Sequence, residues 1–215
     1  MLIYICAIKE FHVRKKTANL TGRNLQLARK LLLDVVSLFE KNSINYHLEG
    51  GTLLGIVRDN DLLPWDHDVD ISVPDSDVSK LKTLGPELLK LGYKFSKRKS
   101  HLEFGPINRG SYSLFKVKPM LKYLGHMVAP HLFYDLIVLD IFIKSSDETY
   151  TYWQAQGKVM RVESKYYESY ELVPYRGFQL RAPNLYRDYL TEKYGDWSVV
   201  VKEWQCGNDE KTICS

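Results

Sequence analysis

The stretch HLEGGTLLGIVRDNDLLPWDHDVDISV, residues His47–Val73, decides how this chain folds and what it can bind. Asp66, Asp68 and Asp70 occur at every second position, and valine or isoleucine occupies the alternate positions from residue 69 to residue 73. In an extended strand this alternation places the acids on one face and the apolar side chains on the other. The strand therefore buries one face and lines a cleft with the other.

Three carboxylates at this spacing repel one another, and a cation is needed to offset the repulsion when they converge. Oxygen-only ligands favour a hard ion, so the acidic face is predicted to bind Mg²⁺ or Mn²⁺. A solvated acidic edge or loop is the alternative for such a ladder taken alone. The residues upstream favour the metal site.

A glycine pair and an arginine precede the acidic strand. Gly50 and Gly51 let backbone N–H groups approach a phosphate, and Thr52 is predicted to cap a short helix whose N-terminus attracts anions. Arg58 ends that helix with a planar guanidinium suited to phosphate. An ordinary turn and a surface arginine are the alternatives, but in combination with the acids these residues predict phosphate and metal chemistry.

His67 has the opposite strand parity from the acids and is predicted to be a buried structural residue.

The most apolar run of the chain, residues 131–143, is predicted to be a central strand that carries an acid into the core. A buried aspartate is costly unless charged partners or a cation satisfy it. Asp135 and Asp140 compete for this role, and they have opposite strand parity.

Three of these segments resemble the LicD family, which includes fukutin and fukutin-related protein, within the nucleotidyltransferase-fold superfamily. The first is Gly51–Gly55 with Arg58, followed by PWDHDVDI at residues 64–71. The second is LDIF at residues 139–142, which selects Asp140 over Asp135, although Ile143 stands where the family usually has proline. The third is residues 183–197, where a predicted helix ends in Tyr-Gly-Asp.

The resemblance implies an α+β, nucleotidyltransferase-like fold with a mixed β-sheet flanked by helices. It also implies one catalytic domain over residues 1–215, with the motifs in about residues 24–197. The implied reaction is metal-dependent transfer of a phosphorylated alcohol, such as phosphocholine or ribitol phosphate, from a CDP-linked donor to a glycan hydroxyl with release of CMP. Asp68, Asp70 and Asp140 would be the catalytic and metal-binding residues, and the substrate-binding residues would be Gly51, Thr52, Arg58 and Asp66.

Two other functions use the same residue pattern. A nucleotidyltransferase would attack the proximal phosphorus of a nucleoside triphosphate and release pyrophosphate. A non-catalytic module of this fold would bind a glycan or a nucleotide, but such a module has no need of three candidate metal ligands.

Composition restricts the partners and the compartment. The 215 residues carry a net charge of +4 and no arginine-rich arm, which fits an anionic substrate and does not indicate nucleic-acid binding. Three cysteines without a CxxC pair favour a reducing compartment, so a cytoplasmic location is expected. The apolar opening, Met1–Ile8, is too short for a signal peptide or a membrane span and is expected to be a strand or a packing segment. The alternative is the Golgi lumen, for a trimmed domain of a secretory protein.

Periodicity and turn residues predict the other elements. A helix capped by Asn24 should run to Lys41, and a basic turn is expected at residues 97–99. A helix or a cover over the cleft is expected at residues 150–162. Strands are predicted at residues 44–48, 93–95, 102–104, 112–117 and 178–181. A second helix is predicted from residue 75 or 76, with a break at Gly85-Pro86, and a third is predicted from Pro183 to Gly195.

Overall fold

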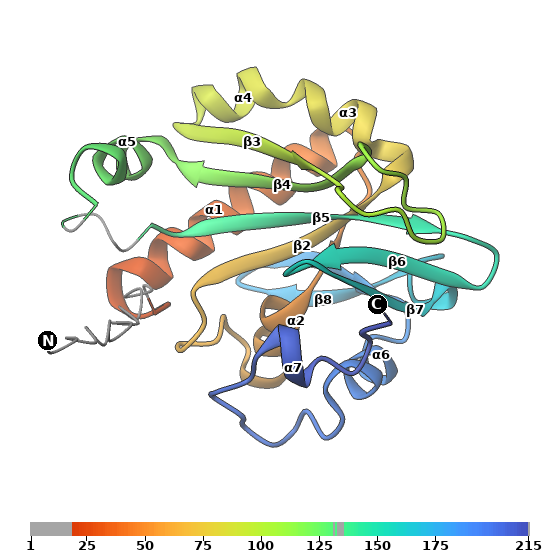
Figure 1. Cartoon of the computed structure of the whole chain (residues 1–215). Coiled ribbons are helices and arrows are strands. Elements are labelled where there is room, and N and C mark those ends of the chain that lie inside the picture. The colour runs from red at the N-terminus through yellow and green to blue at the C-terminus, as the bar shows by residue number, and fades with distance from the viewer. Residues whose placement is uncertain (1–18, 131, 133–135, 215) are drawn as a thin grey trace, which may run out of the picture.

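The acidic strand predicted from the sequence is β2 (Asp68–Pro74), and it lies inside a mixed sheet of order β1-β2-β5-β4-β3. This computed structural model describes residues 19–130, 132 and 136–214, so Met1–Ile8 and Asp135 lie outside the described residues. β2 pairs in parallel with β5 (Val138–Ser146), and the other pairs in the sheet are antiparallel. The fold is therefore α+β with a mixed sheet flanked by helices, as predicted (Figure 1).

The remaining strands complete the sheet and a separate hairpin. β6 pairs with the end of β5 and with β7, and β8 and β9 form a two-stranded sheet of their own. Their bounds, in chain order, are β1 His47–Leu48, β3 Tyr93–Lys99, β4 Tyr112–Pro119, β6 Tyr150–Ala155, β7 Lys158–Glu163, β8 Tyr170–Tyr175 and β9 Phe178–Pro183.

Helices lie on one face of the sheet and along its two edges. In Figure 1, α1 runs behind the sheet, α3 and α4 lie beside β3, and α2, α6 and α7 gather at the opposite side. The helices are α1 Gly22–Lys41, α2 Gly50–Asp59, α3 Val78–Thr83, α4 Gly85–Lys90, α5 Met120–Val128, α6 Tyr186–Tyr194 and α7 Cys206–Asp209, with short 3-10 turns at Asp75–Asp77 and Ser164–Tyr166. None of the helices in the described residues is long and apolar enough to span a membrane.

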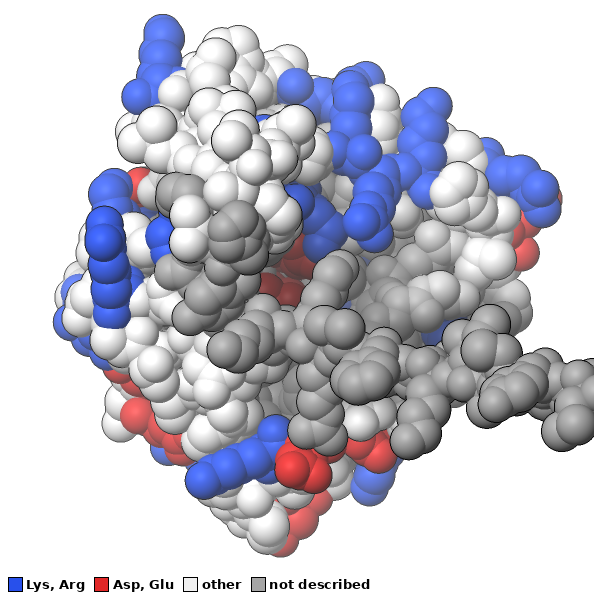
Figure 2. All heavy atoms as spheres, turned by 60° about the vertical axis from the view of Figure 1, so that its left-hand side comes forward, with Lys and Arg blue, Asp and Glu red and all other residues white. Residues whose placement is uncertain are grey.

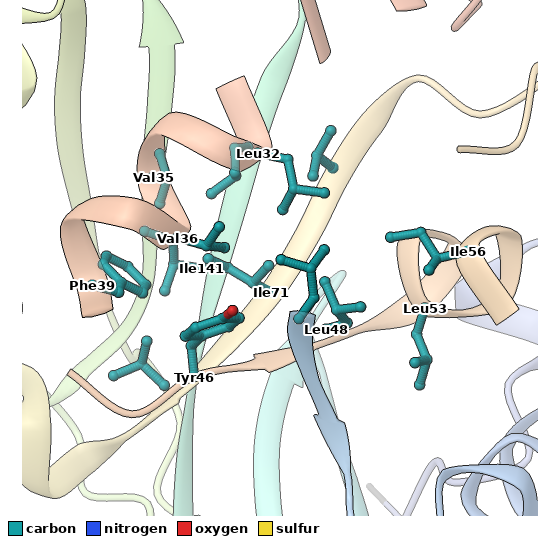
Figure 3. Close-up of a cluster of buried hydrophobic side chains, with 14 of the residues drawn as sticks. Leu32, Val35, Val36, Phe39, Tyr46, Leu48, Leu53, Ile56, Ile71 and Ile141 are labelled. Atoms are coloured by element: carbon teal, nitrogen blue, oxygen red, sulfur yellow. The ribbon is translucent and has the colours of Figure 1, made fainter. Parts of the chain in front are cut away.

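The core lies between α1 and the apolar face of the sheet (Figure 3). Leu32, Val35 and Phe39 repeat at helical spacing on α1 and are fully buried. They meet Ile71 of β2 and Ile141 of β5, whose side chains share one face of the sheet because the two residues are register partners. The opposite face of the same strands is left for polar side chains.

Several predicted boundaries were wrong. α1 begins at Gly22 and its N-cap is the extended Thr21, whereas Asn24 lies inside the helix and its side chain donates to the Asn19 carbonyl. The predicted basic turn at residues 97–99 is the end of β3, paired with β4. Residues 150–163 form the β6–β7 hairpin and not a helix, with a turn at Gln156-Gly157, where both residues have positive φ. The alternative expectation, a cover over the cleft, agrees with the structure, because residues 153–157 line the cleft.

Other predictions were partly confirmed. The break at Gly85-Pro86 separates α3 from α4, and Gly195, with φ +78°, ends α6. The first strand is only His47–Leu48, and residues 102–104 contribute a single bridge, Phe104 to Ile107. Pro183 ends β9, and α6 begins at Tyr186.

Candidate active site

The parallel pairing of β2 with β5 brings together acids that are far apart in the sequence. Asp70 and Asp140 are register partners, so their side chains share the polar face of the sheet. Carboxylate oxygens of Asp68, Asp70 and Asp140 all lie within 4.8 Å of one another. The three acids predicted to bind the metal therefore converge, and they are called the acid trio below.

The start of α2 packs directly against these acids. A Cβ at Gly50 would lie 2.6 Å from Asp70 Oδ2, and a Cβ at Gly51 would overlap Asp66 Oδ2. Gly50 also has φ +53°, a conformation that side chains disfavour. The glycine pair thus lets two carboxylates approach the positive N-terminal end of the helix.

Thr52 has a different structural role from the predicted one. Glu49 is the N-cap of α2, and Thr52 lies inside the helix and is buried. Its Oγ1 accepts a hydrogen bond of 2.8 Å from the Asp70 backbone N–H. Thr52 therefore fixes α2 to β2 at the position of a trio residue.

Asp66 and His67 lie before β2 begins. Asp66 packs against Gly51, and its negative charge helps to raise the pKa of Asp68. It is not one of the three acids whose carboxylate oxygens lie within 4.8 Å of one another. The Asp66 Oδ1 atom accepts a hydrogen bond from the His67 backbone N–H. The prediction of a buried His67 was wrong, because the strand starts one residue later and the side chain is exposed at the mouth of the cleft.

The electrostatics of the acid trio fit a cation. Burial, followed by the neighbouring carboxylates of Asp66 and Asp140, raises the pKa of Asp68 to about 7. Burial and the same crowding raise the pKa of Asp70 well above its ordinary value. Asp140 Oδ1 is buried and has no hydrogen-bond partner among the described residues. Three clustered carboxylates with an unpartnered oxygen are a suitable donor set for a hard divalent ion.

Lys116 is a site residue that the sequence analysis did not identify. It is the register partner of Asp140 on β4, and its Nζ donates to Asp140 Oδ2 at 2.5 Å. Asp70, Asp140 and Lys116 therefore form one row across three adjacent strands. The alternating FKVK pattern of residues 115–118 predicts an amphipathic strand but does not show which side chain meets an acid.

Arg58 lies in the cleft wall, but its guanidinium is already engaged within the protein. Its Nε and Nη2 donate to the Asp59 carboxylate at 2.9 Å each, and Nη1 donates to the Trp197 carbonyl at 3.3 Å. The guanidinium also lies 5.8 Å from the centre of the Trp65 ring. Arg58 therefore joins the end of α2 to the segment that follows α6.

The acid trio, the glycine pair, Lys116 and Arg58 line a cleft of about 1190 Å³. The volume exceeds the usual 300–1,000 Å³ range of small-molecule pockets. All four tryptophans of the chain contribute to its walls, and such rings often stack on sugars or bases. They are Trp65, Trp153, Trp197 and Trp204.

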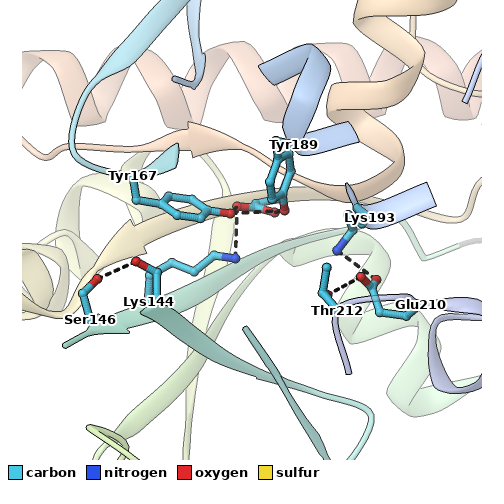
Figure 4. Close-up of polar contacts among 9 residues, drawn as sticks. Lys144, Ser146, Tyr167, Tyr189, Lys193, Glu210 and Thr212 are labelled. Carbon is cyan, nitrogen blue, oxygen red and sulfur yellow. Dashed lines mark hydrogen bonds and ion pairs between the residues drawn. The ribbon is translucent and has the colours of Figure 1, made fainter. Parts of the chain in front are cut away.

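A network of buried polar side chains lies beside the site (Figure 4). Glu49 Oε1 accepts from the Tyr167 hydroxyl at 2.5 Å, and Oε2 accepts from the Tyr189 hydroxyl at 2.7 Å. Lys144 Nζ lies 3.2 Å from Glu49 Oε1 and 3.2 Å from the centre of the Trp153 ring. Burial opposes ionisation of Glu49, but the charges of Lys144 and Lys193, together with the two tyrosine hydrogen bonds, lower the pKa of this carboxyl.

The chain is similar in sequence to a known family and to several known proteins. The family model described as LicD/FKTN/FKRP, nucleotidyltransferase domain, matches residues 43–185. Ribitol 5-phosphate transferase FKRP of Mus musculus is 27% identical over 185 residues, which are 84% of this chain and 33% of that protein. The lipopolysaccharide cholinephosphotransferase LicD of Haemophilus influenzae is 43% identical over 53 residues, 24% of this chain and 20% of that protein.

The human FKRP protein is also 27% identical, over 80% of this chain and 32% of its own length. The chain thus spans about a third of the length of these transferases. Among solved structures, ANT(2″)-Ia in complex with adenylyl-2″-tobramycin has a TM-score of 0.44 and 13% identity, covering 83% of this chain and 81% of that one.

Proposed function

The chain belongs to the LicD/FKTN/FKRP nucleotidyltransferase-domain family, and on that premise we propose that it is a phosphotransferase that modifies a glycan. The proposed donor is a CDP-linked alcohol, and the transferred group is the phosphorylated alcohol, such as phosphocholine or ribitol phosphate. Residues 1–215 would act as one catalytic domain. The activities for which the FKRP and LicD relatives are named support this choice of reaction.

The observation that carries the proposal is the convergence of the acid trio in a large cleft. Asp68, Asp70 and Asp140 would hold Mg²⁺ or Mn²⁺. When bound, the ion would polarise phosphoryl oxygens and neutralise their charge. A purely structural acid cluster would not need a register that crowds aspartates from two separate strands.

In the proposed reaction, a glycan hydroxyl attacks the distal phosphorus of the donor diphosphate. The new P–O bond to the glycan forms as the bond to the CMP oxygen breaks, and CMP leaves with the bonding electrons. Asp140 completes the trio and accepts the proton of the hydroxyl. The backbone N–H groups at the start of α2 and the tryptophan-lined walls would position the two substrates.

The competing reaction is nucleotidyl transfer, in which the proximal phosphorus of a nucleoside triphosphate is attacked. Incubation with Mg²⁺ and either CTP, CDP-ribitol or CDP-choline, in the presence of glycan acceptors, distinguishes the two. Release of CMP from a CDP-alcohol is expected. Release of pyrophosphate from CTP with a nucleotidylated glycan would show that the competing reaction is correct.

Asp70→Asn tests the assignment of the acid trio. The variant removes one charge without changing the shape of the side chain, so the protein should fold and the transfer rate should fall about 100-fold or more. Circular dichroism and thermal unfolding check the fold, and CMP release measures the rate. Full activity in this variant would exclude the metal assignment.

A further inference from the structure

The polar face of the sheet is divided into an acidic half and a basic half. The acidic half is the acid trio on β2 and β5. On β3 and β4, Lys94 is the register partner of Lys118, and Arg98 is the partner of Leu114, two residues before Lys116. Alternation along both strands places all four cations on the face that Asp140 shares. They are called the basic half below: Lys94, Arg98, Lys116 and Lys118.

Among the described residues, only one cation of the basic half has a carboxylate within ion-pair distance. Lys116 pairs with Asp140, but no carboxylate of the described residues lies within ion-pair distance of Lys94, Arg98 or Lys118. Lys94 and Lys118 lie 3.7 and 5.7 Å from the centre of the Tyr123 ring. Burial, and then the charge of Lys116, lowers the pKa of Lys118. Cations that crowd one another on a sheet face favour a bound anion.

The basic half is adjacent to the acid trio. Lys116 lies one strand away from Asp140, and neighbouring strands are about 4.8 Å apart. Arg98 and Lys116 line the same cleft as the acids. Figure 2 shows basic side chains gathered beside a hollow in which acidic side chains are visible. An anion held by Arg98 and Lys116 would therefore lie in the same cleft as a group held at the trio.

We propose that Lys94, Arg98, Lys116 and Lys118 form a binding site for a phosphate group of a substrate, next to the acid trio but separate from it. The inference rests on the proposed function and extends it. The phosphate could belong to the donor diphosphate or to an acceptor glycan that already carries phosphate. The ligand chemistry is the same in both cases, and kinetics separates the two sources.

Direct binding of pyrophosphate without any divalent ion tests the site. In EDTA the acid trio repels anions, and the change in titration calorimetry caused by a variant shows how much of the binding depends on the basic half. We expect the wild-type chain to bind, with affinity that falls as salt is raised. The double variant Arg98→Gln/Lys118→Gln should weaken binding about ten-fold or more, because it removes two charged hydrogen-bond donors.

Lys97→Gln is the matched control. Lys97 is exposed on the opposite face of β3, next to Arg98 in the sequence, and its Nζ lies 5.5 Å from the centre of the Tyr112 ring. This variant should change the affinity less than about two-fold, because its charge lies behind the sheet. Absence of binding by the wild type, unchanged binding by the double variant, or an equal loss in Lys97→Gln would each overturn the proposal.

Steady-state kinetics identifies the source of the phosphate. A raised KM for the CDP-alcohol in the double variant would show that the site holds the donor, and a raised KM for a phosphorylated glycan would show that it holds the acceptor. CMP release with both KM values unchanged would contradict the site. By contrast, pyrophosphate binding that depends on the basic half, with no CMP release from any CDP-alcohol, would count against the proposed function alone.

Discussion

Gly51 shows how one missing side chain shapes the site. The carboxylate of Asp66 fills the space that a Cβ at this position would need. The glycine is therefore required for packing against the acids, in addition to any approach of a phosphate. The sequence could predict that residues 50 and 51 allow a close approach, but it could not show that aspartates of the chain itself make the approach.

Gly51→Ala should lower activity through the position of Asp66. The new Cβ would push the carboxylate away, which costs about 1–3 kcal/mol of stability, and a displacement of this kind should reduce the transfer rate about 10-fold or more. Gly85→Ala is the control, because no atom lies within 4 Å of a Cβ there. Thermal unfolding and CMP release measure both effects. Equal behaviour of the two variants would contradict this account.

Thr52→Val should test the hydroxyl that holds β2. Valine has nearly the same shape, so the main change is the loss of the acceptor for the Asp70 N–H. A buried donor without a partner costs about 1–3 kcal/mol. Denaturant unfolding should show this loss, and the affinity for Mg²⁺, measured by titration, should fall with it. Wild-type stability with wild-type affinity would show that water replaces the hydroxyl.

The acid trio could be predicted from the sequence, whereas its supporting residues could not. Asp68 and Asp70 stand in an alternating pattern, and Asp140 was selected by its resemblance to a family motif. Lys116 and Glu49 depend on partners that only the fold brings near, namely Asp140 for the lysine and Tyr167 for the glutamate. No local pattern indicates such pairs.

At the scale of elements, the buried network joins three parts of the fold that surround the site. Glu49 is the N-cap of α2, Lys144 is on β5, and Tyr189 is on α6. Their contacts hold the start of α2 against the strand that carries Asp140. The position of the glycine pair relative to the acids therefore depends on this network.

Lys144→Met and Glu49→Gln should destabilise the protein less in combination than the sum of their separate effects. Removing the lysine leaves a buried carboxylate without its counter-ion, which costs about 3–5 kcal/mol. The double variant removes both charges, so its loss should be smaller than the sum of the two single losses. A double-mutant cycle of unfolding free energies measures the difference. Additive losses would show that the two charges do not interact.

Elements with strong periodicity were predicted better than those that depend on pairing. The spacing of apolar residues identified α1, because one helical face must be buried against the sheet. The β6–β7 hairpin was not identified, since Lys158 and Arg161 interrupt its apolar pattern and its turn depends on Gln156 adopting positive φ. A strand that is stabilised by its partner carries a weak signal of its own.

At the scale of the whole molecule, one face of the sheet is apolar and buried and the other is charged. α1 covers the apolar face, and the cleft opens on the face that carries the acid trio and the basic half. Crowding of carboxylates on this face makes the metal-free protein less stable at neutral pH. Stability and ligand binding are therefore linked through the same side chains.

Mg²⁺ should stabilise the protein more at pH 8 than at pH 5. The folded-state pKa of Asp68 is raised to about 7, so the metal-free fold is penalised progressively as the pH rises from about 4 to about 7. Bound Mg²⁺ removes this penalty, and the rise in unfolding temperature should be larger at pH 8 by at least roughly 2–4 °C. Differential scanning calorimetry measures it. Asp68→Asn should abolish most of the difference, and an equal rise at both pH values in the wild type would contradict the assignment.

The parallel pairing of β2 with β5 also has a consequence for how the protein is made. During synthesis, Asp68 and Asp70 leave the ribosome long before Asp140, with β3, β4 and three helices between them. Contacts between such distant segments form slowly, because the intervening chain must first be ordered. A nascent chain therefore holds two acids of the trio that cannot meet the third until the last central strand docks.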